Sequence, residues 1–264
     1  MSKQNNLIKR GNIFKLGEHL LLCGDAREKA LIDDFLKRQN LDLVLTDPPY
    51  GIDYVGSKDW QGLRGPSGEA KYFSKHRVIK GDERQNDENY DQFTQKWIES
   101  CKDYLNQPNA FYIFNSEHMI LSLMQGMKYA GLHFAQLIIW IKQAGVLGRK
   151  DYIHQHELIA YGWRGKHKFY RGKGRGLILY PRPQRSILHP TMKPVGLLRK
   201  LILNSTKIGA TVYDPFGGSG STLIACENTK RKCLMVEIEP EYCKTIIDRW
   251  EKLTKLKAEK LSTA

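Results

Sequence analysis

A glycine-rich turn between an apolar strand and a helix constrains the fold of this chain most. The strand is predicted over Thr211–Asp214, and the turn that follows, Pro215–Ser221, has glycine at positions 217, 218 and 220. Glycine permits positive φ and a close approach of backbone to ligand, and the start of the next helix presents unpaired N–H groups. Such a turn favours a ligand with a negatively charged group.

An acid ends the next predicted strand. The apolar run 232–237 closes at Glu237, twenty residues after Gly217. An acid at this place commonly binds the ribose hydroxyls of a nucleotide-like ligand. A dinucleotide-binding dehydrogenase would show the pattern G-x-G-x-x-G, whereas this chain has G-G-S-G. The departure counts against a dehydrogenase.

A second motif, Asp47-Pro48-Pro49-Tyr50, closes the apolar run 41–46. Two consecutive prolines remove two backbone donors and stiffen the turn, so its carbonyls can accept hydrogen bonds from a ligand. A carboxylate, a rigid carbonyl and a ring face suit a flat ligand with an amino group, such as a nucleobase. The alternative is a Pro-Pro turn that only caps a strand.

Apolar runs and helical patterns alternate along the 264 residues, which suffice for a single domain, 1–264. We expect strands at 19–23, 41–46, 110–115, 134–141, 154–162, 211–214 and 232–237. We expect helices near 27–39, 90–105, 117–130, 194–207, 220–229 and 239–257. The alternation predicts an α/β fold with a doubly wound, mostly parallel, seven-stranded sheet. Asp25, Asp47, Asp214 and Glu237 then share the carboxyl edge, where ligands of such folds bind. The tail after Leu253 is expected to fray.

Positive charge is concentrated in one part of the chain. The net charge is +14, and residues 142–200 hold fourteen Lys or Arg and only two acids, with aromatic residues and glycines between them. This pattern favours binding to a nucleic-acid backbone over a solvated loop or a general anionic surface. Phosphate contacts are predicted for Lys142, Arg149, Lys150, Arg171 and Arg175.

Composition and spacing exclude several classes of protein. The longest apolar run, 134–141, is too short to cross a bilayer, and the polar start shows no signal peptide. Five cysteines without a C-x-x-C pair predict buried, reduced thiols in a cytoplasmic protein. His154 and His156 share a strand face, but no further His or Cys has ligand spacing, so no metal is expected. A strand face or a border of the base pocket is the preferred interpretation of this pair.

Taken together, the motifs resemble the S-adenosylmethionine-dependent amino-methyltransferases of DNA. The catalytic motif of that family is (D/N/S)-P-P-(Y/F/W), and its cofactor motif is D-P-F-x-G-S-G. The order here, catalytic motif first, resembles the permuted β group, and Cys23–Ala26, Trp140–Lys142 and His189–Pro194 fit the same group. The resemblance spans about residues 16–250. It implies a circularly permuted, Rossmann-like methyltransferase fold, and by analogy with the sheet of that family the run 152–163 is expected to be the antiparallel strand.

The resemblance also implies roles for individual residues. Asp47 and the Pro48 carbonyl would accept the two N–H groups of the target amine, with Pro49 stiffening the turn, and Tyr50 would stack on a base flipped from the duplex. The adenine ring of the cofactor would meet Asp25 and Ala26, its ribose Glu237, and its methionine carboxylate Thr191 or Lys193, although the 189–194 motif could simply begin a helix. The turn would supply Asp214, Phe216, Gly217, Gly218, Ser219 and Gly220.

Two segments fall outside the regular pattern. Residues 55–90 are long and polar and are interpreted as a loop or lid insertion. Residues 164–186 occupy the place of the target-recognition domain in the β group, but this basic insertion is only about two dozen residues long. Recognition is therefore expected to be short, relaxed or shared with 55–90.

The expected function is methylation of adenine N6 in DNA, because an Asp heads the tetrapeptide. Cytosine-N4 methylation, methylation of RNA or protein glutamine, and a non-catalytic DNA-binding protein are the alternatives. Duplex DNA with a flipped base is the expected partner. A second copy of the chain and a cognate restriction enzyme are further candidate partners, and no membrane contact is expected.

Overall fold

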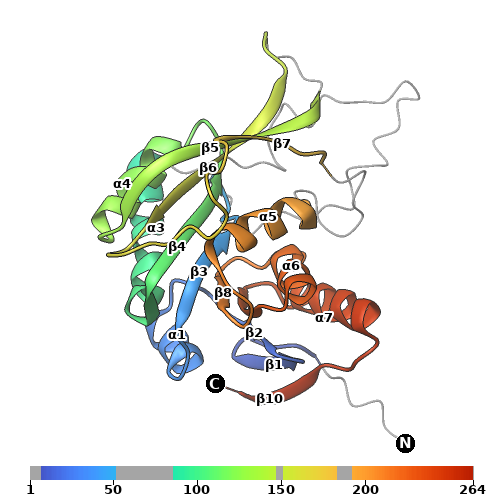
Figure 1. Ribbon diagram of the computed structural model, residues 1–264. Helices are drawn as coiled ribbons and strands as arrows, with labels where there is room; N and C mark the ends of the chain where they lie inside the picture. Colours follow the sequence, from blue (N-terminus) through green and yellow to red (C-terminus); the bar gives the residue numbers. More distant parts are fainter. Residues whose placement is uncertain (1–6, 52–85, 147–150, 183–191, 264) are drawn as a thin grey trace, which may run out of the picture.

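Figure 1 shows the computed structural model, which describes residues 7–51, 86–146, 151–182 and 192–263. The described strands form one sheet in the order β10-β1-β2-β9-β8-β3-β4-β6-β5-β7. The strands are β1 (Asn12–Leu16), β2 (His19–Cys23), β3 (Leu41–Thr46), β4 (Leu105–Asn115), β5 (His133–Val146), β6 (His154–Trp163), β7 (Leu177–Leu179), β8 (Thr211–Asp214), β9 (Lys232–Glu237) and β10 (Glu259–Thr263). The helices are α1 (Lys29–Leu36), α3 (Asp87–Cys101), the short 3-10 helix η2 (Lys102–Tyr104), α4 (Ile120–Tyr129), α5 (Val195–Ser205), α6 (Ser221–Thr229) and α7 (Pro240–Thr254).

The centre of the sheet is parallel, as the alternation of elements predicted. Strands β2, β9, β8, β3 and β4 run in the same direction. Strand β6 lies antiparallel between β4 and β5, which confirms the predicted direction of the run 152–163. All seven predicted strands are present within a few residues of their expected bounds.

The sheet has ten described strands, so the predicted count of seven was wrong. Strand β7 has only three residues, which is too short for a clear pattern, and the five-residue strand β1 was not expected from the sequence. Strand β10 is largely polar and forms because its backbone pairs antiparallel with the outer strand β1. The expected fraying of the tail was therefore wrong, because helix α7 ends at Thr254 and the chain turns back to the sheet.

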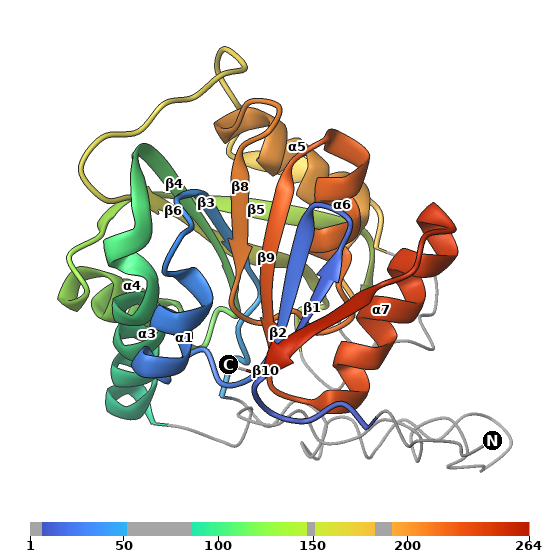
Figure 2. The ribbon, with the colours of Figure 1, turned by 90° about the horizontal axis from the view of Figure 1, so that it is seen from below.

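Helices cover both faces of the sheet (Figure 2). Helices α1, α3 and α4 pack on one face, and α5, α6 and α7 pack on the other. Strand β4 shows the reason, because successive side chains of a strand point to opposite faces. Its Tyr112 and Phe114 pack with the second set of helices, and its Phe111 and Ile113 pack with the first set.

The four predicted acids do lie at or just after the carboxyl ends of parallel strands. Asp25 follows β2, Asp47 follows β3, and Asp214 and Glu237 are the last residues of β8 and β9. Strands β3 and β8 are direct neighbours although they are far apart in sequence. Ligands of open α/β sheets bind at such a reversal of strand order.

Two findings within the described residues bear on the expectations from composition. All five cysteines are buried and free. No helix of the described ranges is long and apolar enough to cross a membrane. Most of the 55–90 segment lies outside the described residues, and its end begins α3, which Asn86 caps by accepting a hydrogen bond from the Asn89 N–H at 2.8 Å.

Candidate active site

Strand β3 delivers Asp47 to the carboxyl edge, where both oxygens of its carboxylate have partners. Oδ1 accepts a hydrogen bond from the Tyr50 hydroxyl at 2.7 Å. Oδ2 accepts one from the Lys193 ammonium at 2.5 Å. The tetrapeptide turns back on itself, so its tyrosine and its acid are in direct contact. Any ligand amine that binds Asp47 has to share or replace these donors.

Lys193 enters the site from the turn before α5, which Pro194 caps. Its ammonium contacts Asp47 and also lies 3.2 Å from Glu157. It lies over the rings of Tyr50 and Phe114, at 5.6 and 5.2 Å from their centres. The side chain is 7% exposed. The structure thus places Lys193 on the acid of the tetrapeptide, and its contact with a methionine carboxylate stays a prediction.

Glu157 completes the site and was missed by the sequence analysis. It lies on β6 opposite Trp140 of β5, and one of its oxygens pairs with Lys142 at 2.8 Å. Two acids and two lysines therefore alternate in the order Asp47, Lys193, Glu157, Lys142. One sequence signal did point to Glu157, since it is the last acid before Asp214 in a strongly basic region.

The predicted exposed phosphate contact of Lys142 is not what the structure shows. Lys142 is 8% exposed and its ammonium pairs with Glu157. The reason is the register of β5 and β6, which brings a lysine and an acid together on the same face of neighbouring strands.

Burial and pairing set the charge state of the cluster. Burial raises the pKa of Asp47; the Lys193 ammonium opposes this shift and the Glu157 charge adds to it. Burial also favours protonation of Glu157, but Lys193 and Lys142 outweigh it and lower its pKa. Burial disfavours the ammonium of Lys193, yet Asp47 and Glu157 together raise its pKa. Lys193 therefore stays charged and holds two carboxylates at once.

The glycine-rich turn lies on the neighbouring strand β8. Gly218 N–H donates to Oε2 of Glu237 at 2.7 Å, and Glu239 N–H donates to Oε1 at 2.8 Å. Burial raises the pKa of Glu237 to about 7, although both hydrogen bonds act against the shift. A Cβ at Gly217 would lie 2.7 Å from Met235, and Gly220 has a φ of +79°. Both positions need glycine for the turn to pack against β9 and α7.

Asp214 supports the turn from within. It is 3% exposed and accepts hydrogen bonds from the Thr46 hydroxyl at 2.8 Å and from Phe216 N–H at 3.1 Å. Burial raises its pKa to about 7. Ser219 is also buried, and its carbonyl accepts a hydrogen bond from Arg249. Asp214 therefore joins the two motifs of the site.

Hydrogen bonds also fix the residues that follow β2. Asp25 accepts hydrogen bonds from the backbone and the guanidinium of Arg27; burial would raise the pKa of Asp25, but these bonds outweigh it and lower the pKa. Ala26 is 2% exposed, and its carbonyl accepts a hydrogen bond from Ser100. Phe216 reaches from the glycine turn toward Phe93 on α3, with ring centres 5.6 Å apart. An aromatic side chain therefore lies between the turn and α3.

Comparison with known proteins identifies the fold and the family. A family model described as DNA methylase matches residues 41–248, which include both motifs. The chain belongs to the N6/N4 DNA methylase family. It is 27% identical over 237 residues to the type II methyltransferase M2.DpnII of Streptococcus pneumoniae, across 82% of this chain and 84% of the relative. It is 27% identical over 255 residues to M.HpaI of Haemophilus parainfluenzae, across 87% and 73%.

Two solved structures share the methyltransferase-like α/β fold with its large, mostly parallel sheet. The M1.HpyAVI–SAM complex superposes with a TM-score of 0.62 at 24% identity, and covers 87% of this chain and 98% of its own. The PvuII methyltransferase, named as cytosine-N4-specific, gives a TM-score of 0.65 at 17% identity and covers 89% of both chains.

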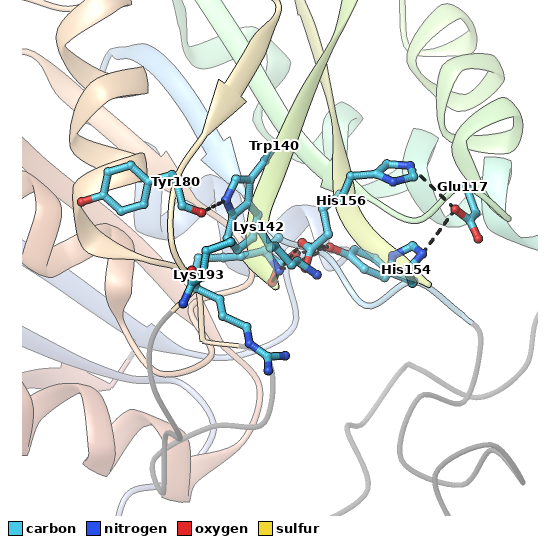
Figure 3. A network of polar contacts seen from close by, with 12 residues as sticks. Glu117, Trp140, Lys142, His154, His156, Tyr180 and Lys193 are labelled. Atoms are coloured by element: carbon cyan, nitrogen blue, oxygen red, sulfur yellow. Dashed lines mark hydrogen bonds and ion pairs between the residues drawn. The ribbon is translucent and has the colours of Figure 1, made fainter. Parts of the chain in front are cut away.

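The histidine pair of the methylase lies on the other face of β6. The rings of His154 and His156 stack with centres 5.3 Å apart, and both lie within 4 Å of Glu117, at 3.4 and 3.8 Å. Figure 3 shows this pair pointing toward Glu117, away from Lys142 and Lys193. Among the described residues, no group of three or more His, Cys, Asp or Glu is arranged to hold a metal ion.

The basic segment of the methylase, which begins at residue 164 after the end of β6, starts at the edge of the sheet opposite the site. Strand β6 runs away from Glu157 and ends at Trp163, which pairs with His133 at the start of β5. Beyond it, Tyr170 N–H donates to the carbonyl of Asn204 in the last turn of α5. The charge of residues 142–200 is therefore divided, because Lys142 lies in the site whereas residues from 164 onward begin at the opposite edge. Arg171 and Arg175 are exposed, and Arg149 and Lys150 lie outside the described residues.

Proposed function

We propose that this methylase transfers a methyl group from S-adenosylmethionine to N6 of adenine in duplex DNA. One observation carries the proposal: the acid-Pro-Pro-Tyr turn and the glycine-rich turn lie on adjacent parallel strands. The hydrogen bond from Thr46 to Asp214 joins the two strand ends at 2.8 Å. A nucleobase amine and a methyl donor bound by the two turns would meet at one edge of the sheet.

The residues of the glycine turn fit the cofactor. Glu237 uses its two oxygens to order the backbone at Gly218 and Glu239, and its free lone pairs suit ribose hydroxyls. The lack of a side chain at Gly217 and Gly220 lets the turn pack tightly on Met235 and Ile246, and it would let the backbone approach the methionine part of the cofactor. Asp25 and Ala26 would border the adenine ring. When bound, S-adenosylmethionine supplies a methyl group on a sulfonium.

The tetrapeptide would prepare the target amine for attack. The lone pair of an exocyclic amine is delocalised into the ring, so the amine is a weak nucleophile. Asp47 and the Pro48 carbonyl, each accepting one N–H, would favour a tetrahedral nitrogen with its lone pair aimed at the methyl group. A nitrogen–carbon bond would form as the sulfur–carbon bond breaks, and the surplus proton on nitrogen would pass to Asp47 or to water. Tyr50 would stack on the flipped base.

The assignment to adenine rests on the Asp at the head of the tetrapeptide. Incubation with labelled cofactor and duplex DNA, followed by digestion to nucleosides, tests it directly. We expect N6-methyladenine, and N4-methylcytosine alone would refute the base while leaving the chemistry in place. A competition experiment with RNA separates DNA methylation from RNA methylation. Absence of any methylated nucleoside would favour a non-catalytic DNA-binding protein.

Further elements of the proposal follow the permuted β group, which the order of the two motifs in this sequence resembles. Residues 1–264 would form a single domain, with 55–90 as a lid and 164–186 as a short target-recognition segment. A homodimer and a cognate restriction enzyme are the proposed partners besides DNA. Mapping of modified bases in the genome of cells that express the protein would give the recognition sequence and show whether it is relaxed.

A further inference from the structure

Lys193 and the target amine of the proposed substrate would donate to the same carboxylate, that of Asp47. Lys193 donates to Oδ2 of Asp47 at 2.5 Å, and Tyr50 donates to Oδ1 at 2.7 Å. The target amine has to donate to the same carboxylate. A charge-assisted hydrogen bond from an ammonium is stronger than one from a neutral amine, so Lys193 competes well for Asp47.

A second carboxylate lies within reach of the same ammonium. Oε2 of Glu157 is 3.2 Å from Nζ of Lys193, whereas Asp47 is at 2.5 Å. A movement of well under the length of the side chain would exchange the closer partner. The ammonium would remain paired throughout, which matters because a buried charge without a partner is costly.

Glu157 is itself fixed in place. Its other oxygen, Oε1, pairs with Lys142 at 2.8 Å, and Gln155 on the same strand donates to the carbonyl of Lys142 at 3.0 Å. Each oxygen of Glu157 therefore faces one lysine. Figure 3 shows Lys142 and Lys193 converging on this side of β6.

We propose that Glu157 is a positioning residue that takes over the Lys193 ammonium when the target amine binds Asp47. The inference deepens the proposed function and rests on it. Glu157 does not touch the substrate in this scheme. It acts through Lys193, by giving the ammonium a second partner so that Asp47 becomes available as an acceptor.

The charges around Asp47 predict how this role would appear in a pH profile. The groups around it are Tyr50 from its own turn, Lys193 from the turn before α5, Glu157 of β6 with Lys142 of β5 behind it, and Asp214 of β8, while Tyr90 of α3 acts on Tyr50. The Glu157 charge raises the pKa of Asp47. Removal of that charge should therefore move the acidic limb of the rate profile to lower pH.

The first experiment measures single-turnover methyl transfer to a duplex oligonucleotide by Glu157→Gln. We expect a rate about 10–100-fold below that of the wild type. Without the Glu157 carboxylate the Lys193 ammonium has no second charged partner, so it stays on Asp47 and competes with the target amine. The dissociation constant of S-adenosylmethionine should be unchanged, and the acidic limb should move to lower pH. Glu117→Gln is the matched control, since it removes an acid from the other side of β6 and should leave both rate and profile as in the wild type.

A double variant, Glu157→Gln with Lys142→Met, separates positioning from a purely structural role. The single variant leaves the buried ammonium of Lys142 without a charged partner, so its Tm should fall. Removing both members of the buried pair restores charge balance, so the Tm should largely return to that of the wild type. The methyl-transfer rate should stay low, because Lys193 still lacks its second partner. Recovery of the rate together with the Tm would overturn the inference.

The outcome for the wild type keeps the two proposals apart. If the wild-type protein methylates no DNA, the proposed function fails. If it methylates DNA and Glu157→Gln matches its rate and pH profile, only the positioning role of Glu157 fails.

Discussion

The Thr46 hydroxyl donates a 2.8 Å hydrogen bond to Oδ1 of Asp214, and this bond joins the two motif-bearing strands at their ends. Thr46 immediately precedes the Asp-Pro-Pro-Tyr turn and Asp214 immediately precedes the glycine turn. The bond is buried, and Asp214 also receives Phe216 N–H. A side chain outside both predicted ligand sets therefore fixes the distance between them.

Thr46→Val should reveal this link. The change keeps the shape and removes the donor, which leaves a buried carboxylate oxygen short of one partner at a cost of about 1–3 kcal/mol in unfolding free energy. The pKa of Asp214, about 7, should rise further because Thr46 lowers it. Denaturant unfolding should show a larger loss above pH 7 than below it. An equal loss on both sides would mean that the hydroxyl does not act on the charged form.

Removal of the acid at the head of the tetrapeptide should stop the chemistry. Asp47→Ala deletes one of the two acceptors of the target amine, and loss of one such preorganised group costs about 10²–10³ in rate. Binding of duplex DNA and of S-adenosylmethionine should be largely unchanged, since neither depends mainly on this side chain. Filter binding measures the affinity for duplex DNA, and a methyl-transfer assay measures the rate. Wild-type activity in the variant would contradict the acceptor model.

The glycine turn offers a matched pair of substitutions. Gly220 and Gly209 have nearly the same φ, +79° and +80°, but a Cβ at Gly220 would lie 3.0 Å from Ile246 while one at Gly209 meets nothing within 4 Å. Each change to Ala should cost about 1–2 kcal/mol through backbone strain. Only Gly220→Ala should also weaken the binding of S-adenosylmethionine, by about tenfold or more. Calorimetric titration of both variants checks this, and an equal affinity would separate the turn from the cofactor site.

Much of the architecture could be predicted because local patterns report on elements and faces. Period-2 and period-3.6 spacing located seven strands and six helices, and the placement of Asp25, Asp47, Asp214 and Glu237 at strand ends followed directly. Strand β10 could not be found this way, because pairing with β1 and not its own apolar pattern holds it in the sheet.

The rest of the site depends on register, which a single sequence does not encode locally. The pairing of Lys142 with Glu157 requires that Trp140 lies opposite Glu157 across β5 and β6. The edge of the sheet at which the basic segment begins, by contrast, could have been predicted from the sequence. Because the run 152–163 was predicted as antiparallel, Trp163 already had to lie at the edge away from Asp47.

The affinity for S-adenosylmethionine should depend on pH through Glu237. Ribose hydroxyls donate to the carboxylate, so binding favours the ionised form, and affinity should fall as the pH drops through the pKa of about 7. The stability of the free protein depends on the charge of Glu237 in the opposite sense. The folded pKa lies above the reference value of 4.5, so folding takes up a proton and the contribution of Glu237 to stability falls as pH rises from 4.5 to about 7.

Calorimetric titration of the cofactor on both sides of pH 7 tests this dependence. Glu237→Gln should bind more weakly and lose most of the pH dependence, and any remainder would belong to Asp214, whose pKa is also about 7. Glu239→Gln should move the dependence to lower pH without abolishing it, because the Glu239 charge raises the pKa of Glu237 while the backbone N–H of residue 239 still donates to it. A pH-dependent affinity that persists in full in Glu237→Gln would place the ribose elsewhere.

The basic segment should bind DNA at a distance from the target base. Residues 158–213 contain no acid, and Lys166, Lys168 and Arg171 are exposed. At about 3.3 Å per residue along β6, the segment begins roughly 23 Å from Glu157. A duplex of about 10 base pairs centred on the target reaches only about 17 Å to each side, whereas one of about 30 base pairs extends past the segment.

Replacement of these three residues by Glu should therefore weaken binding of the long duplex and leave the short one nearly unaffected. The slope of log affinity against log salt should fall by about 0.9 for each phosphate that the variant no longer neutralises. The control replaces Lys15, Lys128 and Lys252, three exposed lysines outside the segment, by Glu, which produces the same change in net charge. If both triple variants weaken both duplexes equally, the effect comes from overall charge. The segment would then not touch flanking DNA itself, and recognition would have to reside at the catalytic edge alone.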